Sequence, residues 1–246
     1  MSAELVAERL AQVRDRIAKA GASPSSVRVV AVTKGFGPGT VEAAVGAGLL
    51  DLGENYAQEL MWKASTAPPG VRWHFLGGLQ RNKLARLAPH VHLWQGLDSG
   101  EGALALARRR PAAAVLVQVR TTAAHGGDGP PAGVSAGGSG PARAPRHGAG
   151  ASEVPALVDS ARAAGLDVRG LMAVGRAHVA REEARRSFRD VASLASTLGL
   201  SEVSMGMSAD FELAVAEGAT IIRLGSALFG QRPPADVPGR DSARLG

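Results

Sequence analysis

Short apolar runs alternate with longer segments of helical periodicity along most of the 246-residue chain. The first run, Val29 to Val32, is continuous and rich in valine, which is typical of a parallel strand buried on both faces. Seven similar runs follow, and an Ala- and Leu-rich stretch that favours a helix comes after each. The predicted strands are 27–33, 49–53, 72–76, 92–96, 113–119, 168–174, 202–205 and 220–224.

A helix is predicted ahead of the first strand, because Leu10, Val13 and Ile17 recur at helical spacing and Gly21 ends the segment. Strands that alternate with helices pair in parallel through right-handed crossovers. Eight such units in about 250 residues favour a closed (β/α)8 TIM barrel of the α/β class. The alternative is an open doubly wound sheet. Its G-x-G-x-x-G signal after the first strand is missing, since Gly35, Gly37 and Gly39 have the wrong spacing.

The chain is predicted to form one folded domain, the barrel, over residues 1–230. Residues 121–150 are dominated by Gly, Ala, Pro and Ser, which predicts a flexible insertion after the fifth strand. Residues 231–246 contain three prolines, and we expect an unstructured C-terminal tail there.

Composition and charge narrow the class of protein. Hydrophobic residues make up 45% of the chain and charged residues 20%, which permits a sizeable core. Cysteine is absent, so disulfides, thiolate metal sites and cysteine nucleophiles are excluded, and we predict no metal site. The net charge of +6 could indicate nucleic-acid binding, but the arginines are interleaved with acids, as in residues 181–186, and we expect none. Charged residues interrupt the N-terminal segment and no apolar run has membrane-spanning length, so a cytoplasmic protein without membrane contact is predicted.

The chemistry of such a barrel lies where the strands end at their carboxyl side. Lys34 directly follows the first apolar strand, so its ammonium should be partly desolvated. Desolvation lowers a lysine pKa, and the neutral amine can form a Schiff base with an aldehyde. The alternative is a lysine that only extends from a strand end into solvent.

Arg223 lies inside the apolar eighth strand, where a guanidinium needs an acid or a ligand as acceptor. A purely structural ion pair is the alternative. Gly225 and Ser226 follow at a strand-to-helix turn that can hold a phosphate. Ser204 and Ser208, after the seventh strand, could add phosphate contacts or could simply cap a helix.

Further positions are open to two interpretations. Asn55 and Glu54 follow Gly53 at the end of the second strand and could position a cofactor ring or the lysine, or Asn55 could cap the next helix. His74 in the third strand lies between two aromatic residues and could face a ligand or be a satisfied core histidine.

Five groups of residues, in this order along the chain, resemble the pyridoxal phosphate homeostasis protein family, whose barrels are similar to the N-terminal domain of bacterial alanine racemase. They are 31–34 (AVTK), 53–59 (GENYAQE), 73–77 (WHFLG) with 79–83 (LQRNK), 170–173 (GLMA), and 204–210 (SMGMSAD) through 223–230 (RLGSALFG). The resemblance implies a fold type III barrel for pyridoxal 5'-phosphate (PLP) that buffers the free cofactor and supplies it to other enzymes.

The resemblance implies that Lys34 forms the internal aldimine with PLP and that Arg223 faces the pyridine nitrogen. The predicted cofactor-binding residues are Lys34, Asn55, His74, Ser204, Met205, Ser208, Arg223, Gly225 and Ser226. Apo forms of PLP enzymes are the implied partners, and a monomer or weak dimer is expected. The chain departs from the family in two respects. No lysine follows Lys83, whereas the family usually carries a lysine and a glycine in the loop after the fifth strand, and Gly78 occupies a variable position within the third-strand motif.

The predicted role is cofactor binding without appreciable catalysis. PLP accepts electrons best when its ring nitrogen is protonated, and a guanidinium such as Arg223 can only donate a hydrogen bond to that nitrogen. Alanine racemases use a tyrosine as a second proton-transfer group, whereas the only tyrosine here is Tyr56. A PLP-dependent amino-acid racemase or lyase is the alternative function.

Overall fold

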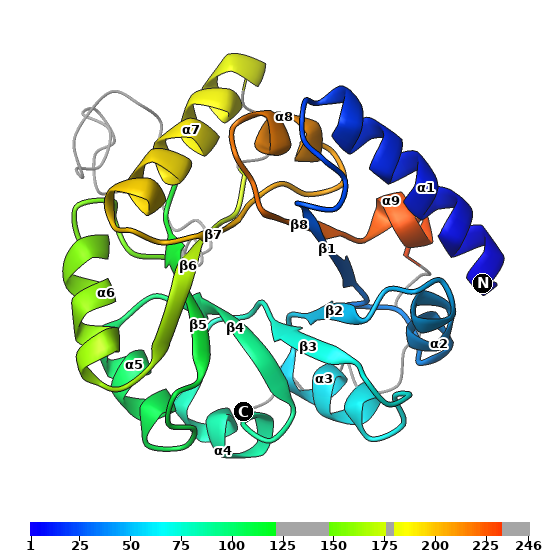
Figure 1. Cartoon of the computed structure of the whole chain (residues 1–246). Helices are drawn as coiled ribbons and strands as arrows, with labels where there is room; N and C mark the ends of the chain where they lie inside the picture. Colours follow the sequence, from blue (N-terminus) through cyan, green and yellow to red (C-terminus); the bar gives the residue numbers. More distant parts are fainter. Residues whose placement is uncertain (122–147, 176–179, 233–246) are drawn as a thin grey trace, which may run out of the picture.

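Eight parallel strands close into a barrel in sequence order in the computed structural model, which describes residues 1–121, 148–175 and 180–232. Hydrogen bonds between β1 and β8 complete the closure, so the predicted TIM barrel is confirmed and the open sheet is excluded. Figure 1 shows the strands enclosed by helices. The strands are β1 (Arg28–Val32), β2 (Asp51–Glu54), β3 (Arg72–Phe75), β4 (Val91–Leu97), β5 (Ala114–Val119), β6 (Asp167–Ala173), β7 (Glu202–Ser204) and β8 (Ile221–Leu224).

Each predicted strand corresponds to an observed one, and no strand end differs by more than two residues. The predicted insertion lies mostly at 122–147 and most of the predicted tail lies at 233–246, and both of these ranges are outside the described residues. Within the described part of the insertion, Ala149 forms an isolated parallel bridge with Val119.

Helices cover the outside of the barrel. They are α1 (Ala3–Lys19), α2 (Gly39–Gly46), α3 (Ala57–Ala64), α4 (Arg81–Leu87), α5 (Gly100–Ala107), α6 (Val154–Ala163), α7 (Arg181–Thr197), α8 (Phe211–Ala216) and α9 (Ser226–Phe229). The predicted N-terminal helix is confirmed as α1. Ser2 caps it by accepting a hydrogen bond from the Leu5 N–H, and Gly21 adopts a φ of 95° just beyond its end.

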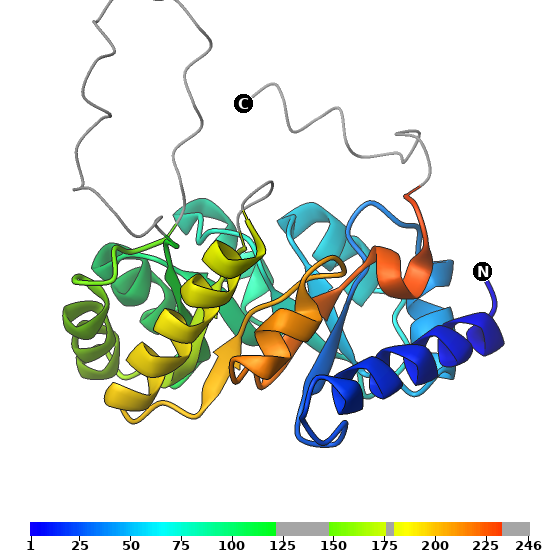
Figure 2. The same ribbon diagram turned by 90° about the horizontal axis from the view of Figure 1, so that it is seen from above.

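The N-terminal helix completes the outer layer next to β8. The helix that follows β8, α9, has only four residues, which is too short to cover a strand. In its place α1 packs against α9, α8 and α2, and the Arg9 guanidinium donates to the Leu228 carbonyl oxygen at 3.0 Å. Figure 2 shows α1 lying alongside α9 at the same edge of the molecule. The barrel is therefore closed on the outside by a segment from the opposite end of the chain.

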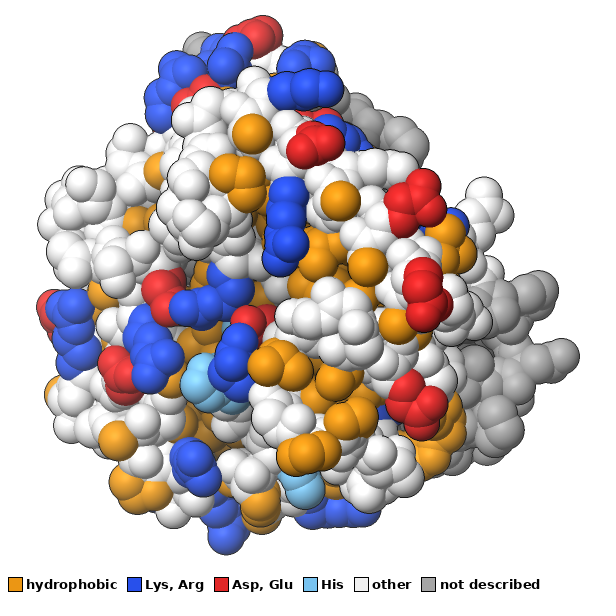
Figure 3. Space-filling view, turned by 45° about the vertical axis from the view of Figure 1, so that its right-hand side comes forward, with side chains coloured by type: hydrophobic (Ala, Val, Ile, Leu, Met, Phe, Trp, Pro, Cys, Tyr) orange, Lys and Arg blue, Asp and Glu red, His pale blue; other side chains and the backbone are white. Residues whose placement is uncertain are grey.

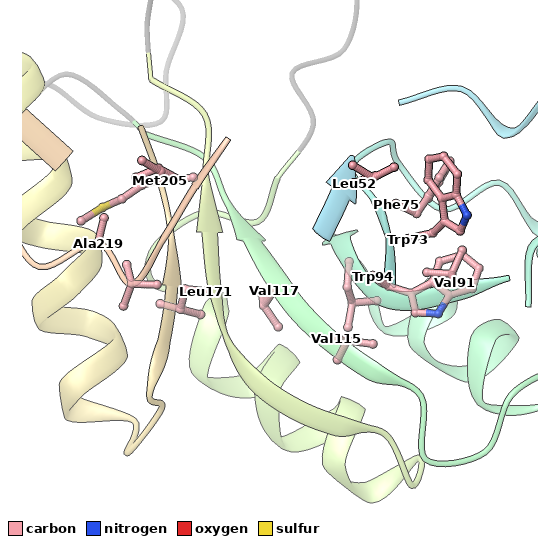
Figure 4. Close-up of a cluster of buried hydrophobic side chains, with 14 of the residues drawn as sticks. Leu52, Trp73, Phe75, Val91, Trp94, Val115, Val117, Leu171, Met205 and Ala219 are labelled. Carbon is pink, nitrogen blue, oxygen red and sulfur yellow. The ribbon is translucent and has the colours of Figure 1, made fainter. Parts of the chain in front are cut away.

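Apolar side chains form two separate clusters. The larger lies between strands and helices, where Trp73, Phe75 and Trp94 pack on the outer face of the sheet (Figure 4). The smaller fills the barrel interior and consists of Val30, Leu93, Ala114, Leu116, Met172 and Ile221. The buried polar residues His74, Gln95, Ser204 and Arg223 fill the rest of the barrel interior.

The surface carries both signs of charge. Figure 3 shows Lys and Arg side chains interspersed with Asp and Glu on the face in view, without a continuous patch of one sign. No helix in the described part of the chain is long and apolar enough to cross a membrane.

Candidate functional site

A cavity of about 820 Å³ opens at the carboxyl ends of the strands. It brings together six of the nine predicted site residues, namely Lys34, Asn55, Ser208, Arg223, Gly225 and Ser226. These residues come from β8, from the loops after β1, β2, β7 and β8, and from the first residue of α9. The position agrees with the rule that barrel sites are built from the loops at this end.

Lys34 projects from the end of β1 and is half-buried in the cavity wall. Burial lowers the pKa of its ammonium group, and the positive charges of Arg232 and Arg223 lower it further. The carboxylates of Glu54 and Glu59 act in the opposite direction but do not reverse the shift. The neutral, nucleophilic form of this amine is therefore more populated near neutral pH than in an ordinary lysine.

A buried ion cluster behind the strand holds both neighbours of Lys34. The Lys63 ammonium, from α3, donates to the Thr33 carbonyl oxygen at 2.7 Å and to Glu54 Oε1 at 2.6 Å. The Thr33 hydroxyl donates to the same Glu54 oxygen at 2.6 Å. Glu59 Oε2 accepts from Lys63 at 3.2 Å and from the Gly35 N–H at 2.8 Å. Residues 33 and 35 are thus fixed, and the amine between them is aimed into the cavity.

Glu54 is completely buried in this cluster. Burial raises the pKa of its carboxyl group to about 7, although Lys63 and Thr33 act to lower it. Its second oxygen, Oε2, has no hydrogen-bond partner among the described residues. The ion pair with Lys63 is therefore sensitive to pH in the neutral range.

Arg223 enters the cavity from β8 with its stem buried in the barrel. Its guanidinium donates to Ser204 Oγ at 2.8 Å and to the Ala173 carbonyl oxygen at 2.7 Å. Both acceptors are uncharged. Burial lowers the pKa of Arg223 to about 10, so the group remains a cation at neutral pH. Among the described residues this buried cation is held by neutral oxygens alone, which suits it to a ligand that supplies a further acceptor.

The turn after β8 and the loop after β7 form one side of the cavity. The backbone N–H groups of Gly225 and Ser226 have no hydrogen-bond acceptor in the described part of the chain. Ser208 Oγ accepts from the Ala227 N–H at 3.1 Å and so ties the two segments together. Gly206 has a φ of 89°, and a Cβ there would lie 2.6 Å from the Ala214 Cβ, so this loop conformation requires glycine. Free N–H groups beside hydroxyls are suited to an anion.

Asn55 lines the cavity, and the alternative that it caps a helix is not observed. The residue at the N-cap of α3 is Tyr56, and no side chain makes a capping hydrogen bond there. The Asn55 amide is free to contact a ligand from the side of β2.

Three predicted site residues do not line the cavity. His74 is buried in the barrel interior, with Nε2 2.9 Å from Asp51 Oδ1 and Nδ1 2.9 Å from Gln95 Nε2. Ser204 is also buried and connects Gln95 to Arg223. Met205 packs in the outer apolar cluster.

Three further residues that support the site, Lys63, Glu59 and Gln95, are not among the site residues predicted from the sequence. Lys63 follows Glu59 by four residues, a spacing that normally indicates an exposed ion pair on a helix surface. Gln95 occupies an inward position of β4, which nothing in the local sequence distinguishes from other polar positions. Lys83 and Arg232 also line the cavity and add positive charge to it.

The fold and the site together define a class: a (β/α)8 barrel in which the half-buried Lys34 and the buried Arg223 face a cavity at the strand ends. The family of the alanine racemase N-terminal domain matches residues 8–233. The alanine racemase of Corynebacterium glutamicum superimposes with a TM-score of 0.67 at 14% identity, covering 96% of this chain and 63% of that one, which shows the shared fold.

Closer relatives narrow the assignment. The pyridoxal phosphate homeostasis protein of Deinococcus radiodurans is 40% identical over 229 residues, 89% of this chain and 97% of that protein. The human protein of the same name is 32% identical, with 98% and 92% covered. PipY of Synechococcus elongatus, solved with PLP bound, is 30% identical with a TM-score of 0.74 over 92% of this chain and 100% of that one. The chain belongs to the alanine racemase N-terminal domain family and, within it, to the pyridoxal phosphate homeostasis proteins.

Proposed function

We propose that this protein binds PLP in the cavity, attaches it covalently to Lys34, and serves intracellular PLP homeostasis by holding and releasing the cofactor. One observation carries the proposal: an amine with a lowered pKa and a buried cation held by neutral oxygens, Lys34 and Arg223, face the same cavity. The PLP-bound structure of PipY supports the same ligand.

The residues present fit the three functional parts of PLP. Bound PLP supplies an aldehyde that reacts with a primary amine, and a conjugated ring that can accept electrons. Lys34 Nζ would take the aldehyde carbon, and the Arg223 guanidinium would donate to the ring nitrogen. The free N–H groups of Gly225 and Ser226, with the Ser226 and Ser208 hydroxyls, would bind the phosphate. Asn55 would contact the ring from β2.

The remaining predicted site residues would act indirectly. Ser204 is buried beside the Arg223 guanidinium and His74 lies further inside the barrel, so neither would contact PLP directly. Met205 would support the loop that carries Ser208, because its buried side chain anchors the start of that loop.

The site favours cofactor storage over catalysis. Arg223 stays protonated at neutral pH and has only N–H groups to offer, so it would hold the ring nitrogen in its unprotonated form. An unprotonated ring is a weak electron acceptor. Tyr56 lies at the cavity rim with 52% of its surface exposed, so it is poorly placed to serve as a fixed proton-transfer group.

A storage role requires exchange with the apo forms of PLP enzymes, which would be the recipients of the cofactor. These enzymes are made in the cytoplasm, so we place the protein there.

Titration with PLP, followed by visible absorbance, tests the proposal. The native protein should develop the colour of a lysine-bound cofactor and saturate at one equivalent. Lys34→Ala should lose that colour but keep weakened binding through the phosphate contacts. Lys83→Ala is the matched control, because Lys83 lines the same cavity and should leave the colour intact. Colour that survives in Lys34→Ala and disappears in Lys83→Ala would reject the assignment.

A further inference from the structure

A continuous chain of hydrogen bonds crosses the barrel interior from the cavity to the opposite end. Arg223 donates to Ser204 Oγ at 2.8 Å, and the Ser204 hydroxyl donates to Gln95 Oε1 at 2.7 Å. Gln95 Nε2 lies 2.9 Å from His74 Nδ1, and His74 Nε2 lies 2.9 Å from Asp51 Oδ1. We call these five residues the interior chain. All five are buried.

The direction of every hydrogen bond in the interior chain follows from Arg223. A guanidinium only donates, so Ser204 Oγ must accept, and the serine hydrogen is then directed to the Gln95 carbonyl oxygen. The Gln95 amide group must therefore donate to His74 Nδ1, which has to be unprotonated. The imidazole proton is left on Nε2, where it donates to Asp51.

The Asp51 end of the interior chain is held as a carboxylate. The Arg72 guanidinium donates to both Asp51 oxygens, at 2.9 and 2.6 Å. Burial alone would raise the pKa of the Asp51 carboxyl group, but the hydrogen bonds from His74 and Arg72 outweigh it and hold that pKa well below its usual range. For His74, burial lowers the pKa, and the bond to Asp51 only partly opposes this. A neutral imidazole beside a carboxylate agrees with the bond directions derived from Arg223.

We propose that His74 and Gln95 are positioning residues that fix the orientation of Arg223 through Ser204. Gln95 holds the serine hydroxyl as a donor, which leaves the oxygen lone pairs free for the guanidinium. Arg223 is then held from two sides, by Ser204 and by the Ala173 carbonyl oxygen. The inference rests on the proposed function in that Arg223 is expected to contact PLP, whereas the interior chain is a property of the protein alone.

Two substitutions of the same histidine separate positioning from simple packing. In His74→Asn the side-chain oxygen can reach the place of Nδ1 and accept from Gln95. In His74→Gln the amide can reach the place of Nε2 and donate to Asp51, but Gln95 loses its acceptor. We expect His74→Gln to weaken PLP binding roughly threefold to tenfold, and His74→Asn to remain within about twofold of the native affinity. Equal losses in both variants would overturn the proposal.

A double-mutant cycle tests whether the effect passes through Arg223. In the Arg223→Met background, His74→Gln should change the PLP dissociation constant by less than about twofold. The same loss with and without Arg223 would show that His74 acts on the cofactor site by another route, and would overturn the proposal.

Nitrogen NMR of the imidazole rings in the protein without cofactor provides a test that does not depend on PLP. At neutral pH, His74 should be uncharged with its proton on Nε2. A proton on Nδ1 would contradict the interior chain. If PLP fails to bind while this tautomer is observed, the proposed function is rejected and the bond directions in the interior chain remain supported.

Discussion

At the scale of single residues, the central feature is the lowered pKa of Lys34. Its first cause is burial, followed by the positive charges of Arg232 and Arg223. Removing one of these charges should raise the Lys34 pKa, because the protonated amine is then less strongly repelled.

Arg223→Met should therefore shift the reactivity of Lys34 to higher pH. The rate of reductive methylation of Lys34, followed by peptide mass spectrometry across a pH series, measures this shift. Arg81→Met is the matched control, because Arg81 is exposed on α4 and paired with Glu101. A midpoint that stays in place or falls in Arg223→Met would contradict the electrostatic account.

Lys34 and Arg223 could be identified from sequence because each combines an unusual position, at or inside an apolar strand, with a family motif. The placement of His74 and Ser204 could not, because their sequence positions give the strand but not the depth below the cavity. Lys63 was missed because an acid four residues before a lysine usually forms a solvent-exposed pair. Here the Lys63 ammonium is buried, because it extends from α3 to Glu54 at the end of β2 and to the Thr33 carbonyl oxygen just beyond β1.

At the scale of elements, we expect the buried ion cluster between β1, β2 and α3 to contribute to the free energy of unfolding by an amount that depends on pH. Lys63→Met leaves the buried Glu54 carboxylate without its cation, which should cost about 3 to 5 kcal/mol when Glu54 is ionised. The pKa of Glu54 is raised from 4.5 to about 7 in the folded protein. Between these two pH values the folded protein therefore keeps a proton on Glu54 that the unfolded chain releases. A group of this kind stabilises the fold at low pH, and the contribution is lost as the pH rises through about 7.

The destabilisation by Lys63→Met should accordingly be larger at about pH 8.5 than at about pH 5.5, where a protonated Glu54 needs no cation. Urea unfolding of both proteins at the two pH values measures the difference. Addition of Glu54→Gln should remove most of the pH dependence. An equal cost at both pH values would show that the ion pair is not the cause.

The N-terminal helix should be essential to the barrel, because α1 occupies the place that a full-length helix after β8 would otherwise take. Leu10 is 2% exposed in α1, and Leu10→Ala should cost about 2 to 5 kcal/mol in the free energy of unfolding. Leu5, 38% exposed in the same helix, provides the control, and Leu5→Ala should cost less than about 0.5 kcal/mol. Similar costs for both would mean that α1 contributes by helix formation rather than by packing.

Strand positions followed from the sequence because each strand is a short segment, in most cases apolar, between stretches of helical periodicity. The packing of α1 beside β8 could not be predicted from the sequence, because it depends on the short length of α9. That length is set by Gly230, which has a φ of 76° and ends the helix after one turn. No local pattern shows that Arg9 in α1 and Leu228 in α9, which are 219 residues apart, will be in contact.

At the scale of the whole molecule, the proposed storage role implies slow chemistry, because Tyr56 lies at the cavity rim with about half of its surface exposed. We expect the PLP-loaded protein to racemise or decarboxylate common amino acids at well below about one turnover per second, a rate that ordinary enzymes reach or exceed. Chiral chromatography after long incubation with alanine, lysine and arginine measures this rate. Faster turnover would favour the racemase or lyase alternative.

The most direct test of the central claim is borohydride reduction of the PLP-loaded protein followed by peptide mapping. The chain has only four lysines, Lys19, Lys34, Lys63 and Lys83, so the position of a stable adduct can be assigned without ambiguity. The account predicts one adduct per chain, on Lys34. An adduct on the surface residue Lys19, or none at all, would contradict it.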